Sequence, residues 1–262
     1  MPSSICFDRA AAFYDQTRGF PPGVDAEVAQ LALQLIGGRT PILEVGVGTG
    51  RIARPMIAQG ARVVGIDLSR AMMKQMRLAQ PDAQLIQGDA MRLPFADACF
   101  DAVVAVHVFH LVGDWQVGLR EARRVLRPEG VLLIGNNHHA ANPVRALRNY
   151  FEQRLRPDEP PRSGWRLVDE VIVPALLHSG ARMHFVESKP WTTHTTPRRE
   201  IEALRQRLWS STWSVDDEQL GEAIADVEAL ALAQFGDLDT EVELTHQFHW
   251  RCFEGLGRCK LG

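Results

Sequence analysis

The sequence has few cysteines and no long apolar run. Its four cysteines, Cys6, Cys99, Cys252 and Cys259, include no C-x-x-C pair, so we expect free thiols in a reducing cytoplasm and neither a metal nor a nucleophile role. No apolar stretch approaches the ~18 residues that cross a bilayer. The first residues, Met-Pro-Ser-Ser-Ile-Cys-Phe-Asp, lack the positive charge and apolar core of a secretory signal. We therefore expect a cytoplasmic protein that does not use a membrane.

The chain also lacks an excess of positive charge. It has 29 Lys and Arg residues against 32 Asp and Glu residues, a formal net charge of −3. Proteins that bind nucleic acid usually show a basic balance or a basic stripe. The nearest cluster, Arg123, Arg124 and Arg127, falls on a helix that we interpret as scaffold. A nucleic-acid partner is therefore not expected.

Short apolar runs alternate with helical patterns along the first half of the chain, which is typical of strand–helix units on a parallel sheet. Two later stretches, 183–191 and 242–253, alternate enough to be antiparallel strands. The pattern predicts an α/β fold with a mostly parallel, seven-stranded sheet and helices on both faces. The five parallel strands are expected at 41–45, 62–66, 84–87, 100–106 and 131–134. Helices are expected between them, one after a glycine-rich loop at 46–50 and running to about 59, and others at 70–79 and 114–126.

We expect a single domain over 1–262, with an N-terminal helical cap over 1–40 and a ligand-binding core over 41–136. Two further stretches, 137–166 and 197–236, look mostly helical and are too long for simple connections. Long insertions at one end of a scaffold usually form a lid or a specificity element. We therefore predict a helical lid from these insertions.

The strongest motif is a glycine-rich loop that follows the first strand and opens a helix. It has Glu44, then glycines at 46, 48 and 50, with Thr49 before the last. Glycines let a backbone turn tightly and approach a ligand, because no Cβ stands in the way. A dinucleotide fingerprint, G-x-G-x-x-G, would need glycine where Arg51 stands. A tight turn without a ligand is the alternative interpretation.

Two aspartates follow the next two strands. Asp67, before Leu68, could accept both hydrogen bonds of a ribose diol, and charge-assisted bonds of this kind are strong. Asp89, with the backbone of Ala90 and Met91, could bind the edge of an adenine. The alternatives are a helix-stabilising acid at position 67 and a turn aspartate at position 89.

Histidines follow strands four and five, at the edge that faces the ligand crevice in a parallel sheet. His107 is expected at the cofactor or the pocket wall and His110 at the substrate, where an imidazole could remove a proton. His138 is a candidate for lining the substrate pocket, as is Trp165 in the insertion. Each histidine could instead be a packed, hydrogen-bonded residue, and Trp165 could be lid core. Adjacent histidines on a strand point apart, so we expect no metal.

These motifs together resemble class I S-adenosylmethionine (SAM)-dependent methyltransferases, most closely the small-molecule branch related to ubiquinone and menaquinone biosynthesis. The resemblance rests on 44–50, Asp67, Gly88-Asp89 with Leu93-Pro94-Phe95, 126–130 before strand five, and an N-terminal Tyr14-Asp15. It covers residues 10–136 well and 137–240 in outline only. It implies a Rossmann-like fold with a SAM-binding core at 41–136. It also implies glycine-loop contacts to the methionine part of SAM, Asp67 on the ribose and Asp89 on the adenine.

The resemblance implies transfer of a methyl group from SAM to a small molecule by in-line displacement, with S-adenosylhomocysteine as product. Little is needed beyond holding the acceptor near the methyl group, and a base is required only if the acceptor must lose a proton. His110 and Tyr14 are the candidate catalytic residues, and Tyr14 could close over the cofactor.

Motifs that the sequence lacks bear on the identity of the methyl acceptor and on the alternative functions. The chain lacks the Asn-Pro-Pro-Tyr motif of enzymes that methylate amino groups of adenine or glutamine, and the Pro-Cys nucleophile of cytosine C5 enzymes. An NAD(P)-binding oxidoreductase would need the missing glycine at Arg51 and a Tyr-x-x-x-Lys pair, which is absent. A SAM-binding sensor without transferase activity would carry the same cofactor motifs and stays open.

Overall fold

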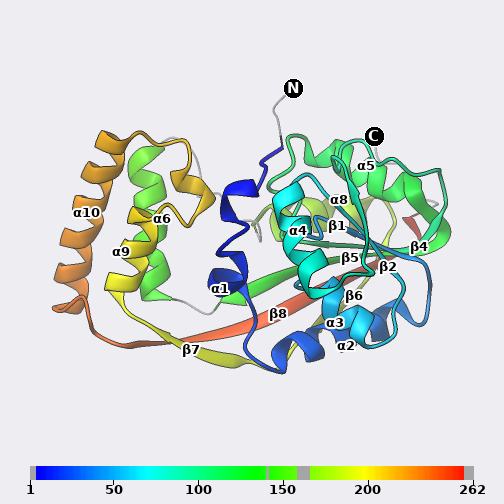
Figure 1. Cartoon of the computed structure of the whole chain (residues 1–262), viewed down its shortest axis with the longest axis horizontal. Helices are drawn as coiled ribbons and strands as arrows, with labels where there is room; N and C mark the ends of the chain where they lie inside the picture. Colours follow the sequence, from blue (N-terminus) through cyan, green and yellow to red (C-terminus); the bar gives the residue numbers. More distant parts are fainter. Residues whose placement is uncertain (1–3, 140–141, 158–165, 257–262) are drawn as a thin grey trace. The chain divides into compact units, whose positions relative to one another are not determined.

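The computed structural model describes residues 4–139, 142–157 and 166–256, and these divide into two compact units. Unit 1 comprises residues 1–137, 163–189 and 248–262, and unit 2 comprises residues 138–162 and 190–247 (Figure 1). Trp165 lies outside the described residues. No helix of the described part is long and apolar enough to cross a membrane.

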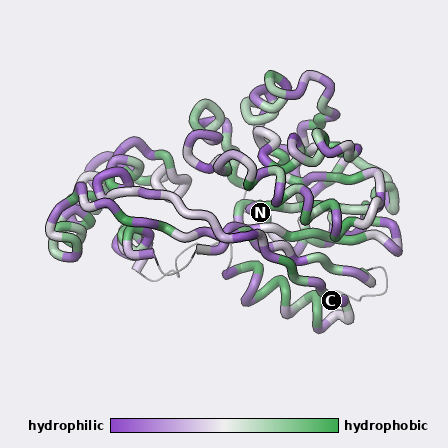
Figure 2. Tube along the Cα trace, turned by 90° about the horizontal axis from the view of Figure 1, so that it is seen from below, coloured by the Kyte–Doolittle hydropathy of each residue, from purple (hydrophilic) through white to green (hydrophobic). Residues whose placement is uncertain are grey.

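Unit 1 is built on seven strands of an eight-stranded sheet, in the order β3-β2-β1-β4-β5-β8-β6, with helices on both faces (Figure 2). The eighth strand, β7, pairs with β8, so the sheet has one strand more than the seven predicted. The first five strands are parallel, and β6 runs antiparallel to β8. The predicted α/β fold with a mostly parallel, Rossmann-like sheet is thus confirmed. The strands are β1 (Ile42–Val45), β2 (Val63–Asp67), β3 (Gln84–Gln87), β4 (Phe100–Val106), β5 (Leu126–His139), β6 (Arg182–Glu187) and β8 (Val242–Glu254).

Two helices of unit 1, α4 and α5, begin at residues whose side chains cap them. Ser69 Oγ accepts the Met72 N–H at 3.1 Å, and Asp114 Oδ1 accepts the N–H groups of Gln116 and Val117. The helical elements are η1 (Asp8–Ala10), α1 (Tyr14–Arg18), α2 (Val24–Ile36), α3 (Ala53–Ala58), α4 (Arg70–Ala79), α5 (Trp115–Val125), the π-helical η2 (Leu167–Ile172) and α8 (Val173–His178).

Three local expectations need correction. The helix expected directly after the glycine-rich loop starts only at Ala53, so Pro55 falls in its first turn, where the missing N–H is harmless. Strand β5 begins at Leu126, ahead of the strand expected at 131–134, and its pairing with β4 contains a bulge. The strand expected over 183–191 ends at Glu187, and a separate strand follows in unit 2.

The strand register decides where the loops of unit 1 meet. Val45 of β1 pairs with Ile66 of β2 on one side and with Ala105 of β4 on the other. The three strands therefore reach their carboxyl ends at nearly the same level. Because β1 is followed on opposite sides by β2 and β4, a crevice opens beyond these ends, as expected at a topological switch point.

Unit 2 is a helical layer with a hairpin. Helices α6 (Pro143–Leu155), α9 (Pro197–Arg205) and α10 (Asp217–Phe235) pack through a core of aliphatic and aromatic side chains that includes Leu147, Phe151 and Ile224. The short η3 (Ser210–Thr212) lies between α9 and α10. Strand β7 (Trp191–Thr195) pairs antiparallel with the first part of β8, Trp191 opposite His246.

Replacing either of two glycines of unit 1 by alanine should change the stability of the protein, in opposite directions. A Cβ on Gly135 in β5 would lie 2.7 Å from the Trp250 ring and 2.8 Å from the Phe248 ring, whereas the nearest atom to one on Gly118 in α5 is 3.4 Å away. We expect Gly135→Ala to lower the free energy of unfolding by about 1–3 kcal/mol through overpacking. Gly118→Ala should raise it by up to about 1 kcal/mol, because alanine favours the helix.

Thermal unfolding followed by circular dichroism, with calorimetry to separate the transitions of the two units, measures both changes. A Gly135→Ala variant as stable as the parent would show that β5 and β8 are not packed as closely as described.

Candidate active site

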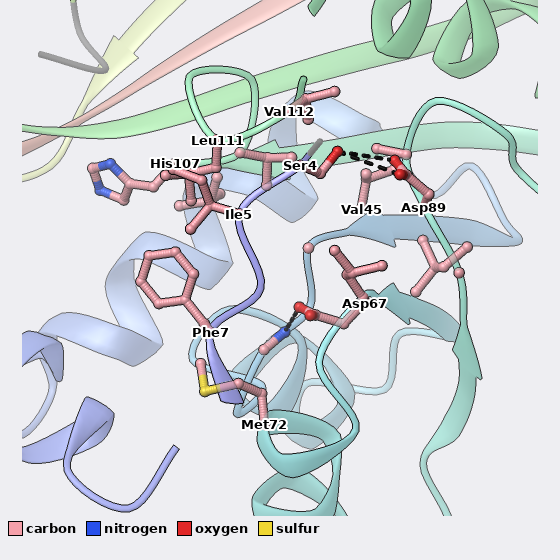
Figure 3. A pocket seen from close by; sticks show the side chains of 18 of the residues that line it. Ser4, Ile5, Phe7, Val45, Asp67, Met72, Asp89, His107, Leu111 and Val112 are labelled. Atoms are coloured by element: carbon pink, nitrogen blue, oxygen red, sulfur yellow. Dashed lines mark hydrogen bonds between the residues drawn. The ribbon is translucent and has the colours of Figure 1, made fainter. Parts of the chain in front are cut away.

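A cavity of about 660 Å³, part of it open to solvent, lies at the carboxyl edge of the unit 1 sheet (Figure 3). The loops after β1, β2, β3 and β4 form its walls, together with the N-terminal segment. The lining residues are Ser4, Ile5, Phe7, Tyr14, Val45, Gly46, Gly48, Ile66, Asp67, Leu68, Met72, Gly88, Asp89, Ala90, Val106, His107, Val108, Leu111 and Val112.

The loop after β1 reaches the cavity because its glycines adopt backbone conformations that side chains disfavour. Gly46 has φ +70° and Gly48 has φ +56°. A Cβ on Gly46 would also collide with the side chain of Val108 from the loop after β4. The Gly46 N–H donates to Ile66 O at 2.8 Å, which fixes the loop against β2. The loop thus presents bare backbone to the cavity.

Asp67 ends β2 and connects two loops at the cavity. Its Oδ2 accepts the Gly48 N–H at 2.8 Å, and its Oδ1 accepts the Ser69 N–H at 2.8 Å (Figure 3). Burial raises the pKa of the Asp67 carboxyl, and these backbone hydrogen bonds oppose the rise. Each oxygen keeps a further acceptor position, because a carboxylate offers about four. Asp67 can therefore bind a ligand hydroxyl without releasing the loop.

Asp89 lies on the neighbouring wall, after β3. Its Oδ1 accepts the Met91 N–H at 2.9 Å. The Ser4 hydroxyl donates toward both carboxylate oxygens, at 3.2 and 3.3 Å, and its oxygen accepts the Gly113 N–H at 3.2 Å (Figure 3). The N-terminal segment therefore contacts the carboxylate that was predicted to bind an adenine.

The N-terminal segment supplies more of the cavity than the sequence indicated. Ser4, Ile5 and Phe7 line it together with the predicted Tyr14, and the Ile5 N–H donates to Leu111 O at 2.9 Å. The rings of Phe7 and Tyr14 meet edge to face, with centroids 6.2 Å apart. Neither periodicity nor glycine spacing marks residues 4–7, and only their contacts in the fold identify them.

His107 lines the cavity immediately after β4, as predicted. Its φ of +54° is unusual for a residue with a side chain, and its N–H donates to Gly135 O at 3.2 Å. Its Nε2 accepts the Asn137 N–H at 3.2 Å, so the neutral ring carries its proton on Nδ1. The ring is therefore fixed in one tautomer beside the cavity.

His110 is not among the lining residues. Its ring meets that of His107 edge to face at 6.5 Å, and burial lowers its pKa to about 4. The imidazole is neutral at pH 7, and a group with so low a pKa is a weak general base at that pH. Its predicted catalytic and substrate roles stay predictions.

Four other predicted cofactor residues support the cavity from behind. Thr49 donates its hydroxyl to Asp15 of α1, Gly50 faces Arg54 and Met76, and the Met91 N–H holds Asp89. Glu44 is only 2% exposed, and burial raises the pKa of its carboxyl well above the usual range. None of the four is a lining residue, so direct contact of these side chains with a cofactor stays a prediction.

His138 is exposed and belongs to unit 2, and its predicted role as a substrate residue stays untested, as does that of the undescribed Trp165. Within the part of the chain that the structure describes, no group of three or more His, Cys, Asp or Glu side chains is arranged to hold a metal ion.

Comparison with known proteins places this site in context. A family of methyltransferase domains matches residues 43–134. A demethylmenaquinone methyltransferase of Renibacterium salmoninarum is 32% identical over 155 residues, which are 58% of this chain and 65% of that protein. An uncharacterised methyltransferase of Mycobacterium tuberculosis is 29% identical over 211 residues, 80% of this chain and 79% of that protein. The match to the first relative thus spans less than two thirds of its length.

Solved structures agree on the fold. A provisionally assigned methyltransferase from Bacillus halodurans superimposes with a TM-score of 0.59 at 19% identity, covering 89% of this chain and 99% of that one. At this identity the likeness concerns the fold alone. The sequence match and the fold agree, and residues 43–134 are similar to methyltransferase domains.

Proposed function

We propose that this chain transfers the methyl group of SAM to a small organic acceptor. The observation that carries the proposal is the cavity in which the glycine loop, Asp67 and Asp89 come together at the carboxyl edge of the sheet. The proposal includes a cytoplasmic protein that uses neither nucleic acid nor a membrane as partner.

The lining residues suit the three parts of SAM. Asp67 has acceptor positions left for the two ribose hydroxyls, and the bare loop at Gly46 and Gly48 leaves room for the methionine part. Asp89 and Ala90 face the place proposed for the adenine, beside apolar side chains such as Leu111. Arg51, which occupies the position of the third dinucleotide glycine, donates to Arg18 O at 2.8 Å and lies over the Phe20 ring. A dinucleotide-binding loop would have a glycine at this position, so the presence of Arg51 favours SAM over a dinucleotide.

Bound SAM would supply a methyl group already activated by a sulfonium. The protein then has to bind and orient SAM and the acceptor, and it has to exclude water from the site. The two carboxylates would fix the nucleoside, and apolar side chains from the loop after β4, Val108, Leu111 and Val112, would shield the cavity. None of these residues needs to move a proton.

We propose a small molecule as acceptor because two relatives, 32% and 35% identical, are named demethylmenaquinone methyltransferases. Demethylmenaquinone is the substrate named for those relatives. The family match ends at residue 134, before unit 2 begins. A quinone-like acceptor is therefore one candidate, and the helical insertions, proposed as a lid, would select it.

Replacing Asp67 tests the cofactor site. We expect Asp67→Asn to weaken S-adenosylhomocysteine binding more than tenfold in calorimetric titration, since it removes charge-assisted hydrogen bonds to the ribose. Asp101→Asn is the matched control: Asp101 pairs with Arg127 at the start of β4, the opposite end from the cavity, and its loss should leave affinity unchanged.

Thermal unfolding of both variants separates misfolding from lost contact. An unchanged affinity in a folded Asp67→Asn protein would remove Asp67 from the site. Titration of the parent with NAD should show no binding, and binding of NAD in place of S-adenosylhomocysteine would overturn the methyltransferase proposal.

Replacing Ser4 tests whether the N-terminal segment competes for the adenine site. The Ser4 hydroxyl donates toward both oxygens of Asp89, so a nucleoside that binds this carboxylate would compete with Ser4 for acceptor positions. We expect Ser4→Ala to tighten S-adenosylhomocysteine binding roughly threefold, about the net value of one hydrogen bond. Ser4→Thr keeps a hydroxyl and should bind like the parent. Weaker binding in Ser4→Ala would instead make Ser4 part of the bound site.

A further inference from the structure

Unit 1 has a second cavity, which lies between helix α4 and the edge strand β3. It measures about 760 Å³, part of it open to solvent, and it shares no lining residue with the candidate active site. Strand β3 is the outermost strand on this side of the sheet, and no described strand pairs with its outer edge. We call this cavity the α4–β3 groove. Its lining residues are Arg70, Met73, Lys74, Arg77, Leu85 and Gln87.

Three cations of α4 line the groove in a row. Arg70, Lys74 and Arg77 stand at positions i, i+4 and i+7, so their side chains share one face of the helix. At a rise of 1.5 Å per residue, the row is about 10 Å long. All three residues are exposed, no acid lines the groove, and α4 itself contains neither Asp nor Glu. The groove therefore gathers three positive charges that its own walls do not neutralise.

Helix stability does not account for this row. Arg70 is the first residue of α4, where the helix dipole disfavours a positive charge. Arg70 and Lys74 are one turn apart, and like charges at this spacing destabilise a helix. Acids interspersed with the cations would have offset both effects. A purely structural role therefore explains Arg70 and Lys74 poorly.

The neighbouring contacts leave the cations available. Among the described residues none of the three forms an ion pair, and Arg77 donates one long hydrogen bond, of 3.5 Å, to Leu85 O. Asp8, the acid at the N-terminus of α4, accepts hydrogen bonds from the Ser69 hydroxyl and the Ala71 N–H and does not line the groove.

The remaining walls give the groove an apolar base and a fixed end. Met73 is only 7% exposed and Leu85 is half-buried, and both lie between the cationic face of α4 and the sheet. Gln87 Nε2 donates to Leu68 O at 3.2 Å, which fixes this side chain against the loop after β2. Arg77 covers the carbonyl of Leu85 at the outer edge of β3, and charged side chains at a sheet edge oppose the addition of a strand from another chain. A small molecule therefore suits the groove better than an added strand.

We propose that the α4–β3 groove binds a small anion that carries two or more phosphoryl groups. Phosphoryl oxygens accept charge-assisted hydrogen bonds, in pairs from an arginine and singly from a lysine. A row of three cations matches an extended anion with several charges better than a single compact one. The chain as a whole has a net charge of −3, so the row is a local feature, and a small anion is favoured over a nucleic acid. The site lies in a separate cavity and does not rest on the proposed methyl transfer.

The test uses the full chain with inorganic tripolyphosphate and orthophosphate as probes. We expect calorimetric titration to show one tripolyphosphate per chain, bound at least tenfold more tightly than orthophosphate. Because the cations are exposed, raising the salt concentration should weaken binding. NMR chemical-shift changes on titration should include the methyl group of Met73, which lines the groove.

Single substitutions locate the site. Arg70→Gln and Lys74→Gln should each weaken tripolyphosphate binding at least fivefold. Arg120→Gln is the matched control, because Arg120 is exposed on α5 and lines neither cavity, and its loss changes the net charge by the same amount. The affinity of the Arg120→Gln protein should equal that of the parent.

Thermal unfolding separates a binding role from a structural one. Arg70→Gln relieves the unfavourable charge at the helix N-terminus, and Lys74→Gln relieves repulsion within the row. Each variant should therefore melt at the same temperature as the parent or a higher one. Tripolyphosphate should raise the melting temperature of the parent more than that of either variant.

Four results would overturn the proposal. These are no saturable tripolyphosphate binding, equal binding of orthophosphate, an equal loss of affinity in Arg120→Gln, or unchanged affinity in both folded groove variants. A single-stranded oligonucleotide that binds the parent more tightly than tripolyphosphate, and loses affinity in the groove variants, would make the row part of a nucleic-acid surface instead.

Discussion

The hydrogen bond from the Gly48 N–H to the Asp67 carboxylate joins the two loops on which the site of unit 1 depends (Figure 3). It can form only because β1 and β2 end at the same level, with Val45 opposite Ile66. The left-handed conformation of Gly48 directs its N–H toward the neighbouring strand end. The register of a buried sheet, a conformation available to glycine and one carboxylate therefore fix the position of the loop before any ligand arrives. Such pre-organisation reduces what binding must supply.

The same carboxylate that holds the loop also faces the cavity, and its surroundings set its charge. Burial disfavours the ionised form of Asp67, while two backbone N–H groups favour it. Glu44, behind the loop, has a different environment. The charge of Asp67 adds to burial in raising the pKa of Glu44, and Arg51 only partly opposes this. Two acids that are close in sequence and space thus differ in role: one is exposed to the cavity and hydrogen-bonded, and the other is enclosed behind it.

The sequence predicted those parts of the site that local chemistry determines. Glycine spacing after β1 and acids directly after β2 and β3 are local signals, and Gly46, Gly48, Asp67 and Asp89 do line one cavity. Residues 4–7 were missed because their place at the cavity depends on contacts with Leu111 and Asp89, about a hundred residues away in the chain. Periodicity placed the strands of the sheet but not the break at Ser188, since a strand that ends between two units keeps the same alternation. The spacing that places histidines after β4 also cannot distinguish His107, at the wall, from His110, which packs behind it.

The two units are proposed to recognise different molecules, the cofactor in unit 1 and the acceptor in unit 2. This difference bears on how the chain would select its acceptor. A cofactor that carries its own activated group, as proposed for unit 1, would ask little of the protein beyond position, and the sheet edge there offers backbone and two acids. An acceptor has to be distinguished from many similar molecules, which requires side chains that are costly unless their ligand is present. Unit 2 lies outside residues 43–134, and its helices α6, α9 and α10 enclose a core of their own. Because the family match ends before unit 2 begins, unit 2 is the part of the chain in which side chains that select an acceptor can differ without changing the sheet edge.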